Sequence, residues 1–387
     1  MSTETKILRY LINEIVKGGF REKIVETLYK EKVNSNVLTY LLTYHEVIPF
    51  FYLTLKDSSE KIPKYIYEGL TNHYYALLFK YLSLRDELLN ILKEAKRENL
   101  LLIPIKGLSL AEYGYNRFGL RQMLDIDLLV KETDLVKAEL ILRRLGYKKR
   151  LTKGSEEYWL TKQCHLEFMK KNGDSNTLVD LHFSLDFNRY GKQVLINLWD
   201  RLQKHAIEGE ECFLLSYEDS LISLALHQRR FGKICNLKYV CDAGLILNNE
   251  HFNWDYIIKS AFEEKIRASL YFLLYQVKSM LEFDLGSQLL ALKLPWWKRK
   301  MIGAVINKYT FSPPKKSLFY SYALCHFLLY DTLGYSIKYI IDIPIEQFAK
   351  FYSLPLYSRK TLRIYKIRFL YIPYRLLITS FKFFITN

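Results

Sequence analysis

Two aspartates separated by a single residue, Asp125 and Asp127, are the part of the sequence that most directly suggests chemistry. They lie in the run 124–130, whose other residues are apolar and typical of a β-strand. Because side chains alternate along a strand, the two carboxylates share one face and most of the apolar side chains face a core. Neighbouring carboxylates repel each other unless a cation lies between them. Mg²⁺, which takes oxygen ligands, is the cation that suits such a pair.

A third carboxylate comes from a second expected strand, over residues 177–185. Asp180 and His182 share one face of this strand, and apolar side chains occupy the other. We expect Asp180 to join Asp125 and Asp127 as a catalytic and metal-binding residue. His182 is either a contact for the substrate phosphates or a hydrogen-bond partner that holds a carboxylate in place.

A candidate phosphate-binding turn precedes these strands. The apolar run 101–105 ends abruptly at Lys106 and Gly107, and a helix is expected to start near Ser109. A strand that leads through such a turn into a helix presents backbone N–H groups and a lysine to phosphate oxygens. Arg121, in the loop that follows, is either a phosphate partner through its forked donors or one half of a structural salt bridge.

The surrounding elements divide the chain into three regions. Apolar and polar residues alternate with a strand period between about 100 and 190, whereas residues 1–99 and 191–387 have helical periodicity. The sequence therefore predicts an α+β protein with a mixed sheet between helical N- and C-terminal regions.

Some expected elements have identifiable ends. Thr133 is a candidate cap for a helix that Gly146 stops, and Asn172-Gly173 is a candidate hairpin turn between strands 165–169 and 177–185. Residues 254–282 are expected to be helical throughout.

Composition limits the class of protein. The chain has 387 residues, of which 50% are hydrophobic and 25% charged, as in a folded globular protein. Its formal net charge of +16 predicts attraction to an anionic partner such as a nucleotide, RNA, an acidic protein or a membrane surface. The cysteines are odd in number and have no metal-ligand spacing, so they support neither a zinc site nor a disulfide framework. They are Cys164, Cys212, Cys235, Cys241 and Cys325.

The expected location is the cytoplasm. The first residues are polar and lack the apolar core of an export signal. The longest charge-free run is well short of the roughly 20 residues that span a bilayer.

The segment from Arg359 to Lys382 is basic and aromatic and contains no acidic residue. This composition suits RNA, through charge and stacking, or an anionic membrane surface, through interfacial insertion. A solvated basic face on a packed helix explains it equally well.

Several of these segments, in this order and spacing, resemble a known family: the uncharacterised nucleotidyltransferases of bacteria and archaea, a branch of the DNA polymerase β-like superfamily. The resemblance extends outward to shorter pieces between His45 and Arg375. Its central segments are Ile105-Lys106-Gly107, Arg121, Asp125 to Val130, Leu145-Gly146-Tyr147 and Val179-Asp180-Leu181-His182.

This resemblance implies a palm-like mixed sheet that holds Mg²⁺ or Mn²⁺ on Asp125, Asp127 and Asp180. It also implies that a nucleoside triphosphate is bound at the glycine turn, with Lys106, Gly107, Ser109, Arg121 and His182 as the nucleotide-binding candidates. The implied activity is transfer of a nucleoside monophosphate to an unidentified acceptor, which could be a small molecule, a protein or RNA.

One alternative stays open. The superfamily usually has serine after the turn glycine, whereas Leu108 follows Gly107 here and the nearest hydroxyl is that of Ser109. The glycine is also farther from Asp125 than is typical. A non-catalytic nucleotide- or RNA-binding protein on a degenerate nucleotidyltransferase fold therefore remains the rival hypothesis.

Overall fold

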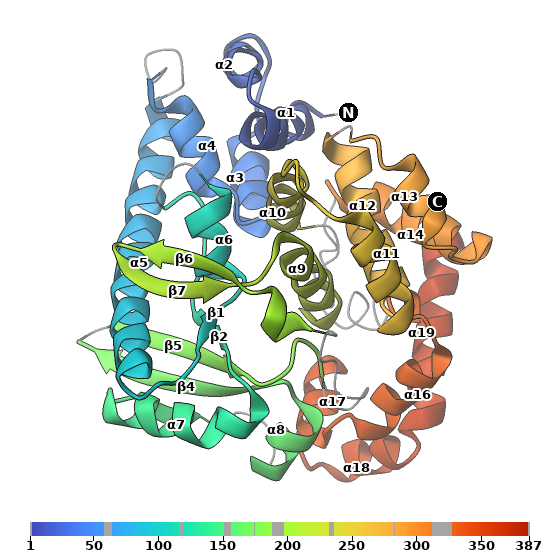
Figure 1. The fold of residues 1–387 in the computed structure, drawn as a ribbon. Helices are drawn as coiled ribbons and strands as arrows, with labels where there is room; N and C mark the ends of the chain where they lie inside the picture. Colours follow the sequence, from blue (N-terminus) through green and yellow to red (C-terminus); the bar gives the residue numbers. More distant parts are fainter. Residues whose placement is uncertain are drawn as a thin grey trace.

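A computed structural model describes most of the chain: residues 2–57, 64–115, 119–150, 156–173, 175–187, 197–231, 236–281, 283–311 and 327–385. A mixed sheet lies at one side of the molecule, and helices from both halves of the sequence pack beside it (Figure 1). The α+β class predicted from the sequence is confirmed.

The sheet has five strands in the order β1-β2-β5-β4-β3. Strands β2 and β5 are parallel, and the other neighbours are antiparallel. The strands are β1 (Ile103–Pro104), β2 (Ile126–Leu129), β3 (Lys148–Arg150), β4 (His165–Asn172) and β5 (Ser175–His182). The two longest, β4 and β5, form the hairpin that the sequence predicts; Asn172 and Ser175 are its last register pair, and the turn begins at Gly173, which has a φ of 58°.

One face of the sheet packs against two helices, α5 (Lys64–Arg97) and α7 (Leu135–Arg144). Alternate residues of the strands, including Ile126, Leu128 and Leu181, are buried in this cluster. The side chains between them, those of Asp127 and Asp180 among them, therefore lie on the opposite face.

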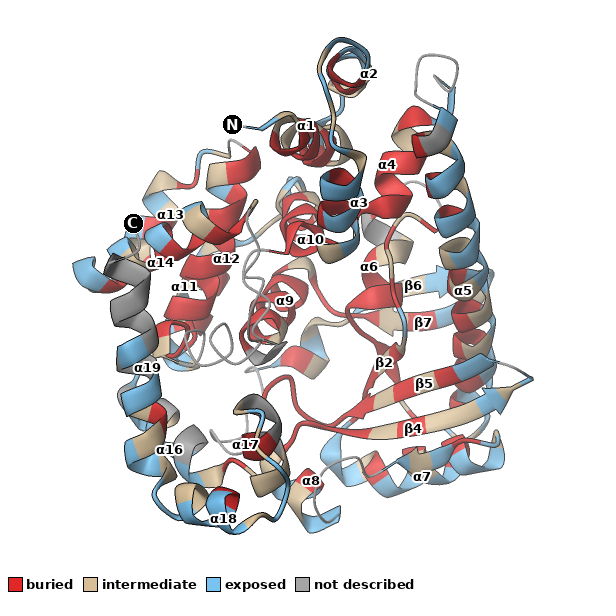
Figure 2. Ribbon diagram, turned by 180° about the vertical axis from the view of Figure 1, so that it is seen from behind, coloured by how far each residue is buried: buried red, intermediate tan, exposed pale blue. Residues whose placement is uncertain are grey.

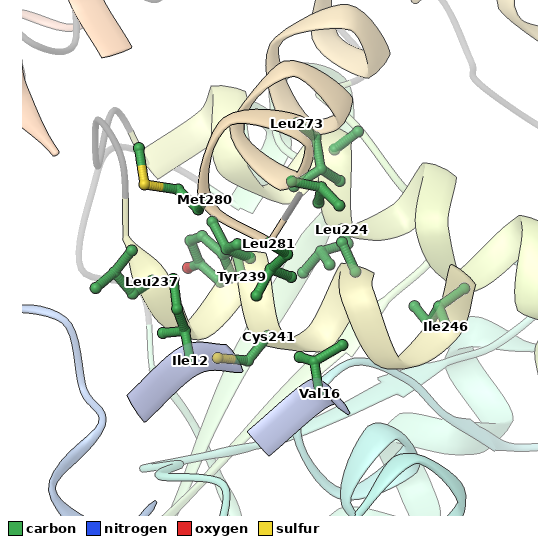
Figure 3. Packing of buried hydrophobic residues seen from close by; sticks show 14 of the residues in the cluster. Ile12, Val16, Leu224, Leu237, Tyr239, Cys241, Ile246, Leu273, Met280 and Leu281 are labelled. Atoms are coloured by element: carbon green, nitrogen blue, oxygen red, sulfur yellow. The ribbon is translucent and has the colours of Figure 1, made fainter. Parts of the chain in front are cut away.

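A larger hydrophobic core joins the N-terminal helices to helices from the C-terminal half. Figure 3 shows residues of α1, α9, α10 and α12 packed together around Cys241. A Cβ atom on Gly244 would lie 2.6 Å from Leu281 and 3.0 Å from Val16, so the close approach of these helices requires glycine there. Besides the first part of α5, the helices of this core are α1 (Thr3–Lys17), α2 (Arg21–Lys30), α3 (Ser35–Tyr44), α4 (Ile48–Leu55), α6 (Gly107–Gly114), α9 (Tyr217–Phe231), α10 (Leu237–Leu247), α11 (Trp254–Glu263), α12 (Arg267–Leu281), α13 (Gly286–Ala291) and α14 (Trp296–Tyr309).

The last helices form a smaller cluster around Phe348 and Ile372. They are α16 (Leu333–Asp342), α17 (Ile345–Phe351), α18 (Arg359–Lys366) and α19 (Arg368–Ile385). A short helix, α8 (Glu156–Lys162), lies between α7 and α18 at the bottom of Figure 1. Within the part of the chain that is described, no helix combines the length and the apolar character needed to cross a membrane.

A second sheet of two strands, β6 (Gln203–Ile207) and β7 (Glu210–Leu214), contradicts the expectation of helices alone after residue 194. Its two-residue turn, Glu208-Gly209, has a positive φ at both positions, which is the backbone of a tight hairpin turn. The strands are short and rich in charged residues, so a strand period is hard to recognise in them.

Two expected helix boundaries are also wrong. The helix α7 has Asp134 rather than Thr133 at its N-cap, because a 3₁₀ turn over Glu132–Asp134 precedes it. The stretch 254–282 is two helices, α11 and α12, since Lys265 between them has a φ of 54°. The stop at Gly146 is confirmed; its φ is 88°.

Candidate functional site

A row of acidic residues crosses three neighbouring strands of the sheet. Asp127 in β2 pairs with Asp180 in β5, and Asp180 pairs in turn with Glu167 in β4. Register partners point to the same face, and neighbouring strands lie only about 4.8 Å apart. The side chains of Asp127 and Asp180 are 9% and 18% exposed. The backbone pairing thus holds two carboxylates together in a largely buried position.

Asp125 lies beside this row, one residue before β2 begins, and is partly exposed. The sequence had suggested that Asp125 lies inside the strand. In the structure it lies just before the first residue of the strand. Burial and the neighbouring charge of Asp127 raise the pKa of Asp125 to about 6. Burial and the charges of Asp127 and Asp125 likewise raise the pKa of Asp180 well above its usual range.

Lys106 and His182 contact the central carboxylate. The ammonium Nζ of Lys106 donates to Oδ1 of Asp127 at 2.5 Å, and Nε2 of His182 lies 2.8 Å from the same oxygen. Lys106 Nζ and His182 Nε2 are 3.1 Å apart. Burial opposes ionisation of Asp127, but Lys106 and His182 outweigh it and hold the pKa of Asp127 well below its usual range.

The electrostatics of the cluster show that one positive charge does not balance it. Lys106 keeps Asp127 ionised, whereas burial, and after it repulsion from the neighbouring carboxylates, raises the pKa values of Asp125 and Asp180. A divalent cation would relieve this repulsion. Ligand atoms of Asp127, Asp180 and His182 lie within 4.8 Å of one another, which is close enough for one ion. The donor set present therefore fits a divalent metal.

The glycine turn adjoins the acidic row through the backbone. The N–H of Ile105 donates to the carbonyl oxygen of Asp127 at 3.0 Å, which places the turn at the edge of β2. Lys106 has a φ of 54°, and α6 begins at Gly107. Positive φ at a lysine is unusual, and here it directs the side chain to Asp127 at the start of a helix. Ser109 is buried two residues farther into α6.

Arg121 is engaged elsewhere. Its guanidinium donates from Nε and Nη2 to the carboxylate of Asp242 in α10, at 2.8 to 3.1 Å, and Asp242 also accepts from the hydroxyl of Tyr115 at 2.5 Å. The side chains of Arg121 and Asp242 are 5% and 0% exposed. Of the two interpretations of Arg121 that the sequence left open, this structure shows the salt bridge. The pair fastens the loop before β2 to α10.

Two residues near the site, Glu167 and Lys238, were not anticipated. Glu167 extends the acidic row, and its alternation with His165 in the sequence was the available signal. Lys238 in α10 is buried, pairs with Glu46 and contributes a positive charge that lowers the pKa of Asp125. His165 lies with its Nε2 3.6 Å from Oδ2 of Asp180.

The family assignment follows from a comparison with protein families. The profile of the family described as "Uncharacterised nucleotidyltransferase" matches residues 31–282. The chain belongs to this family. The match includes the sheet, the turn at Gly107 and α9 to α12, and it supports a general nucleotidyltransferase activity. Neither the curated proteins nor the solved structures include a match to this chain.

Proposed function

We propose that this protein is a magnesium-dependent nucleotidyltransferase that transfers a nucleoside monophosphate from an NTP to an acceptor hydroxyl and releases pyrophosphate. The observation that carries the proposal is the pairing of Asp127 with Asp180 beside the turn formed by Lys106 and Gly107. We expect the reaction to take place in the cytoplasm, where NTPs and Mg²⁺ are available.

Asp125, Asp127 and Asp180 would hold the metal, since they supply oxygen donors and two of them carry raised pKa values that a cation would lower. Bound there, Mg²⁺ or Mn²⁺ would orient the triphosphate and offset the charge that develops on the leaving pyrophosphate. Lys106 adds a fixed positive charge next to Asp127, and the N–H groups at the start of α6 suit phosphate oxygens.

Asp180 is suited to accept the proton of the acceptor. In the transfer, the acceptor oxygen forms a bond to the α-phosphorus, the bond from that phosphorus to pyrophosphate breaks, and the hydroxyl proton passes to Asp180. Its raised pKa makes its ionised form a better proton acceptor than an ordinary aspartate. His165, 3.6 Å from Asp180, and His182 in the same strand fix the orientation of the acidic row.

Label transfer tests the proposal directly. Purified protein is incubated with each α-labelled NTP, Mg²⁺ or Mn²⁺ and a cell extract, and labelled products are separated by size and charge. Metal-dependent transfer that disappears in Asp127→Asn supports the proposal. Transfer that survives unchanged in an Asp125→Ala, Asp127→Ala double variant removes these residues from the mechanism.

A second candidate function is nucleotide binding without turnover. The observation that favours it is the contact of Lys106 with Asp127, because the ammonium group already neutralises one of the carboxylates. This candidate predicts that a non-hydrolysable NTP binds equally well with and without Mg²⁺ in a calorimetric titration. The enzyme predicts binding that strengthens with Mg²⁺.

We also propose that the C-terminal helices bind an anionic membrane surface, with RNA as the alternative partner. An exposed apolar stripe at helical spacing runs along α19 through Leu370, Tyr374 and Ile378, and Ile367, immediately before the helix, extends it. Arg359, Arg363 and Lys366 are exposed on α18. Figure 2 shows the exposed residues of these two helices at the rim of the molecule. Exposed aliphatic side chains suit a lipid interface better than RNA. The side chain of Lys382, at the end of the basic segment, lies outside the described residues.

A further inference from the structure

A thiol and two imidazoles lie close together beside the acidic row, where β4 begins and β5 ends. Cys164 immediately precedes β4, His165 is the first residue of β4, and His182 is the last residue of β5. His165 and His182 are register partners across the hairpin, and their rings lie 4.9 Å apart. The hairpin register thus brings His182 next to two residues, Cys164 and His165, that precede it by 18 and 17 positions in the sequence. The sequence supported no zinc site because this pairing cannot be seen in cysteine spacing.

The dimensions of this cluster match those of a zinc site. One ligand atom from each of Cys164, His165 and His182 lies within 4.8 Å of the other two. The Sγ of Cys164 is 3.4 Å from Nδ1 of His165. In a tetrahedral site with Zn–S of about 2.3 Å and Zn–N of about 2.0–2.1 Å, the sulfur and nitrogen are about 3.5 Å apart. The observed separation is close to that value.

Each imidazole also has a carboxylate on its other ring nitrogen. Nε2 of His182 lies 2.8 Å from Oδ1 of Asp127, and Nε2 of His165 lies 3.6 Å from Oδ2 of Asp180. Histidines that bind zinc commonly donate their second N–H to a carboxylate, which fixes the tautomer and orients the ring. The Nδ1 of His165 faces the thiol of Cys164 at 3.4 Å.

We propose that Cys164, His165 and His182 form a binding site for Zn²⁺, or for another divalent metal that prefers thiolate and imidazole, next to the acidic magnesium site, with His182 common to both groups of ligand atoms. The thiolate Sγ and the two Nδ1 atoms are the ligands, and Asp127 and Asp180 support them from outside the coordination sphere. A sulfur and nitrogen ligand set selects zinc over magnesium, which requires oxygen. The metal would cross-link the ends of β4 and β5 and fix His182 against Asp127.

Metal retention tests this site without nucleotide. The full chain is stripped with a chelator, loaded with one equivalent of Zn²⁺ in the presence of excess Mg²⁺, desalted, and analysed for zinc by elemental measurement. We expect about one zinc per chain, and binding that is about tenfold or more weaker in Cys164→Ser. The matched control is Cys212→Ser, a buried thiol in β7, which should retain zinc like the unmodified protein. Cys235 and Cys325 lie outside the described residues, so it is the loss of zinc in Cys164→Ser, set against its retention in Cys212→Ser, that identifies Cys164 as the thiolate ligand.

Cobalt substitution gives a second readout that does not depend on the folding of a variant. Bound to the unmodified protein, Co²⁺ should show a thiolate-to-metal charge-transfer band, and this band should persist in Cys212→Ser. Absence of the band, or equal zinc retention in Cys164→Ser and the unmodified protein, overturns the proposal. Because neither measurement uses an NTP, its failure is separable from a failure of nucleotidyl transfer.

Discussion

Asp127 in β2 and Asp180 in β5 are direct register partners across the parallel strand pair of the sheet. Their proximity is set by backbone hydrogen bonds, so an isosteric amide at either position leaves the strands in place. An aspartate-to-asparagine change therefore removes the charge of the carboxylate without removing the strand pairing. The residues can therefore be tested individually by aspartate-to-asparagine changes.

We predict that Asp127→Asn and Asp180→Asn each reduce label transfer by about 10²-fold or more, because each removes a negative charge that holds the metal. Circular dichroism should be unchanged. The matched control is Asp255→Asn, the same chemical change at an exposed position in the first turn of α11, which should keep nearly full activity. Equal activity in all three variants would contradict the assignment.

Arg121→Ala should lower the free energy of unfolding by about 3–5 kcal/mol, because it leaves the buried carboxylate of Asp242 without its main positive partner. Urea denaturation measures this loss. Arg143→Ala removes an exposed partner of Glu139 in α7 and should cost less than about 1 kcal/mol. If Arg121→Ala is as stable as the parent but binds NTP poorly, the arginine serves the substrate instead.

The free energy of unfolding should also depend on the protonation of Asp125. Its pKa is about 6 in the folded protein and returns toward the ordinary value of 3.8 on unfolding. Between these values the folded state binds more protons than the unfolded state, so the contribution of Asp125 to stability falls as pH rises from about 4 through 6. Without divalent metal, Asp125→Asn should therefore raise the free energy of unfolding by about 1–2 kcal/mol at pH 7, and by little near pH 4.

Thermal unfolding with and without Mg²⁺ checks that prediction. The parent protein should gain stability from Mg²⁺ at pH 7 and much less at pH 5, where Asp125, with a pKa of about 6, is largely protonated. Asp125→Asn should gain less at both pH values. If metal-free Asp125→Asn is less stable than the metal-free parent at pH 7, the charged carboxylate of Asp125 stabilises the fold, and the prediction is wrong.

The acidic row was largely predictable from sequence because it depends on strand alternation. The spacing of Asp125 and Asp127, and the same pattern around Asp180, place carboxylates on a face opposite an apolar one, and the structure has that alternation in β2 and β5. What sequence could not supply was register. The pairing of His165 with His182, and of Glu167 with Asp180, follows from which residues face each other across the β4–β5 hairpin.

Contacts between residues far apart in the chain could not be predicted from the sequence either. Arg121 binds an aspartate 121 residues away in α10, and nothing local to either residue identifies the other as its partner. The β6–β7 hairpin was missed for a different reason: its strands are short and mostly polar, and its turn is encoded mainly by the positive φ of Glu208 and Gly209.

Gly107→Ala is expected to weaken NTP binding without weakening the fold. A Cβ atom there would lie 3.4 Å from Nη1 of Arg121 and 3.5 Å from Cβ of Met123, which are ordinary contact distances, so stability should change by less than about 1 kcal/mol. We nevertheless expect the added methyl group to hinder the approach of phosphate oxygens to the N–H groups at the start of α6. We expect KM for the NTP to rise about tenfold with little change in kcat. Gly286→Ala, at the start of α13, is the control.

The C-terminal surface gives a prediction that concerns location rather than chemistry. The side chains of Leu370 and Tyr374 in α19 are among the most exposed apolar ones, at 62% and 58%, next to the basic face of α18. Interfacial binding combines burial of such side chains with attraction of basic residues to anionic lipid, so it should weaken with salt and with loss of either component. We expect the protein to float with vesicles that contain phosphatidylglycerol and not with pure phosphatidylcholine.

Leu370→Glu with Tyr374→Glu should abolish this flotation, whereas Leu290→Glu, which alters an equally exposed leucine on α13, should not. Both variants change exposed residues, so both should fold. If the double variant still floats, the stripe on α19 is not the contact with lipid. RNA binding depends on charge and stacking and does not require an aliphatic stripe. If single-stranded RNA binds more tightly than the vesicles and prevents flotation of the parent protein, the basic residues bind a nucleic acid instead of lipid.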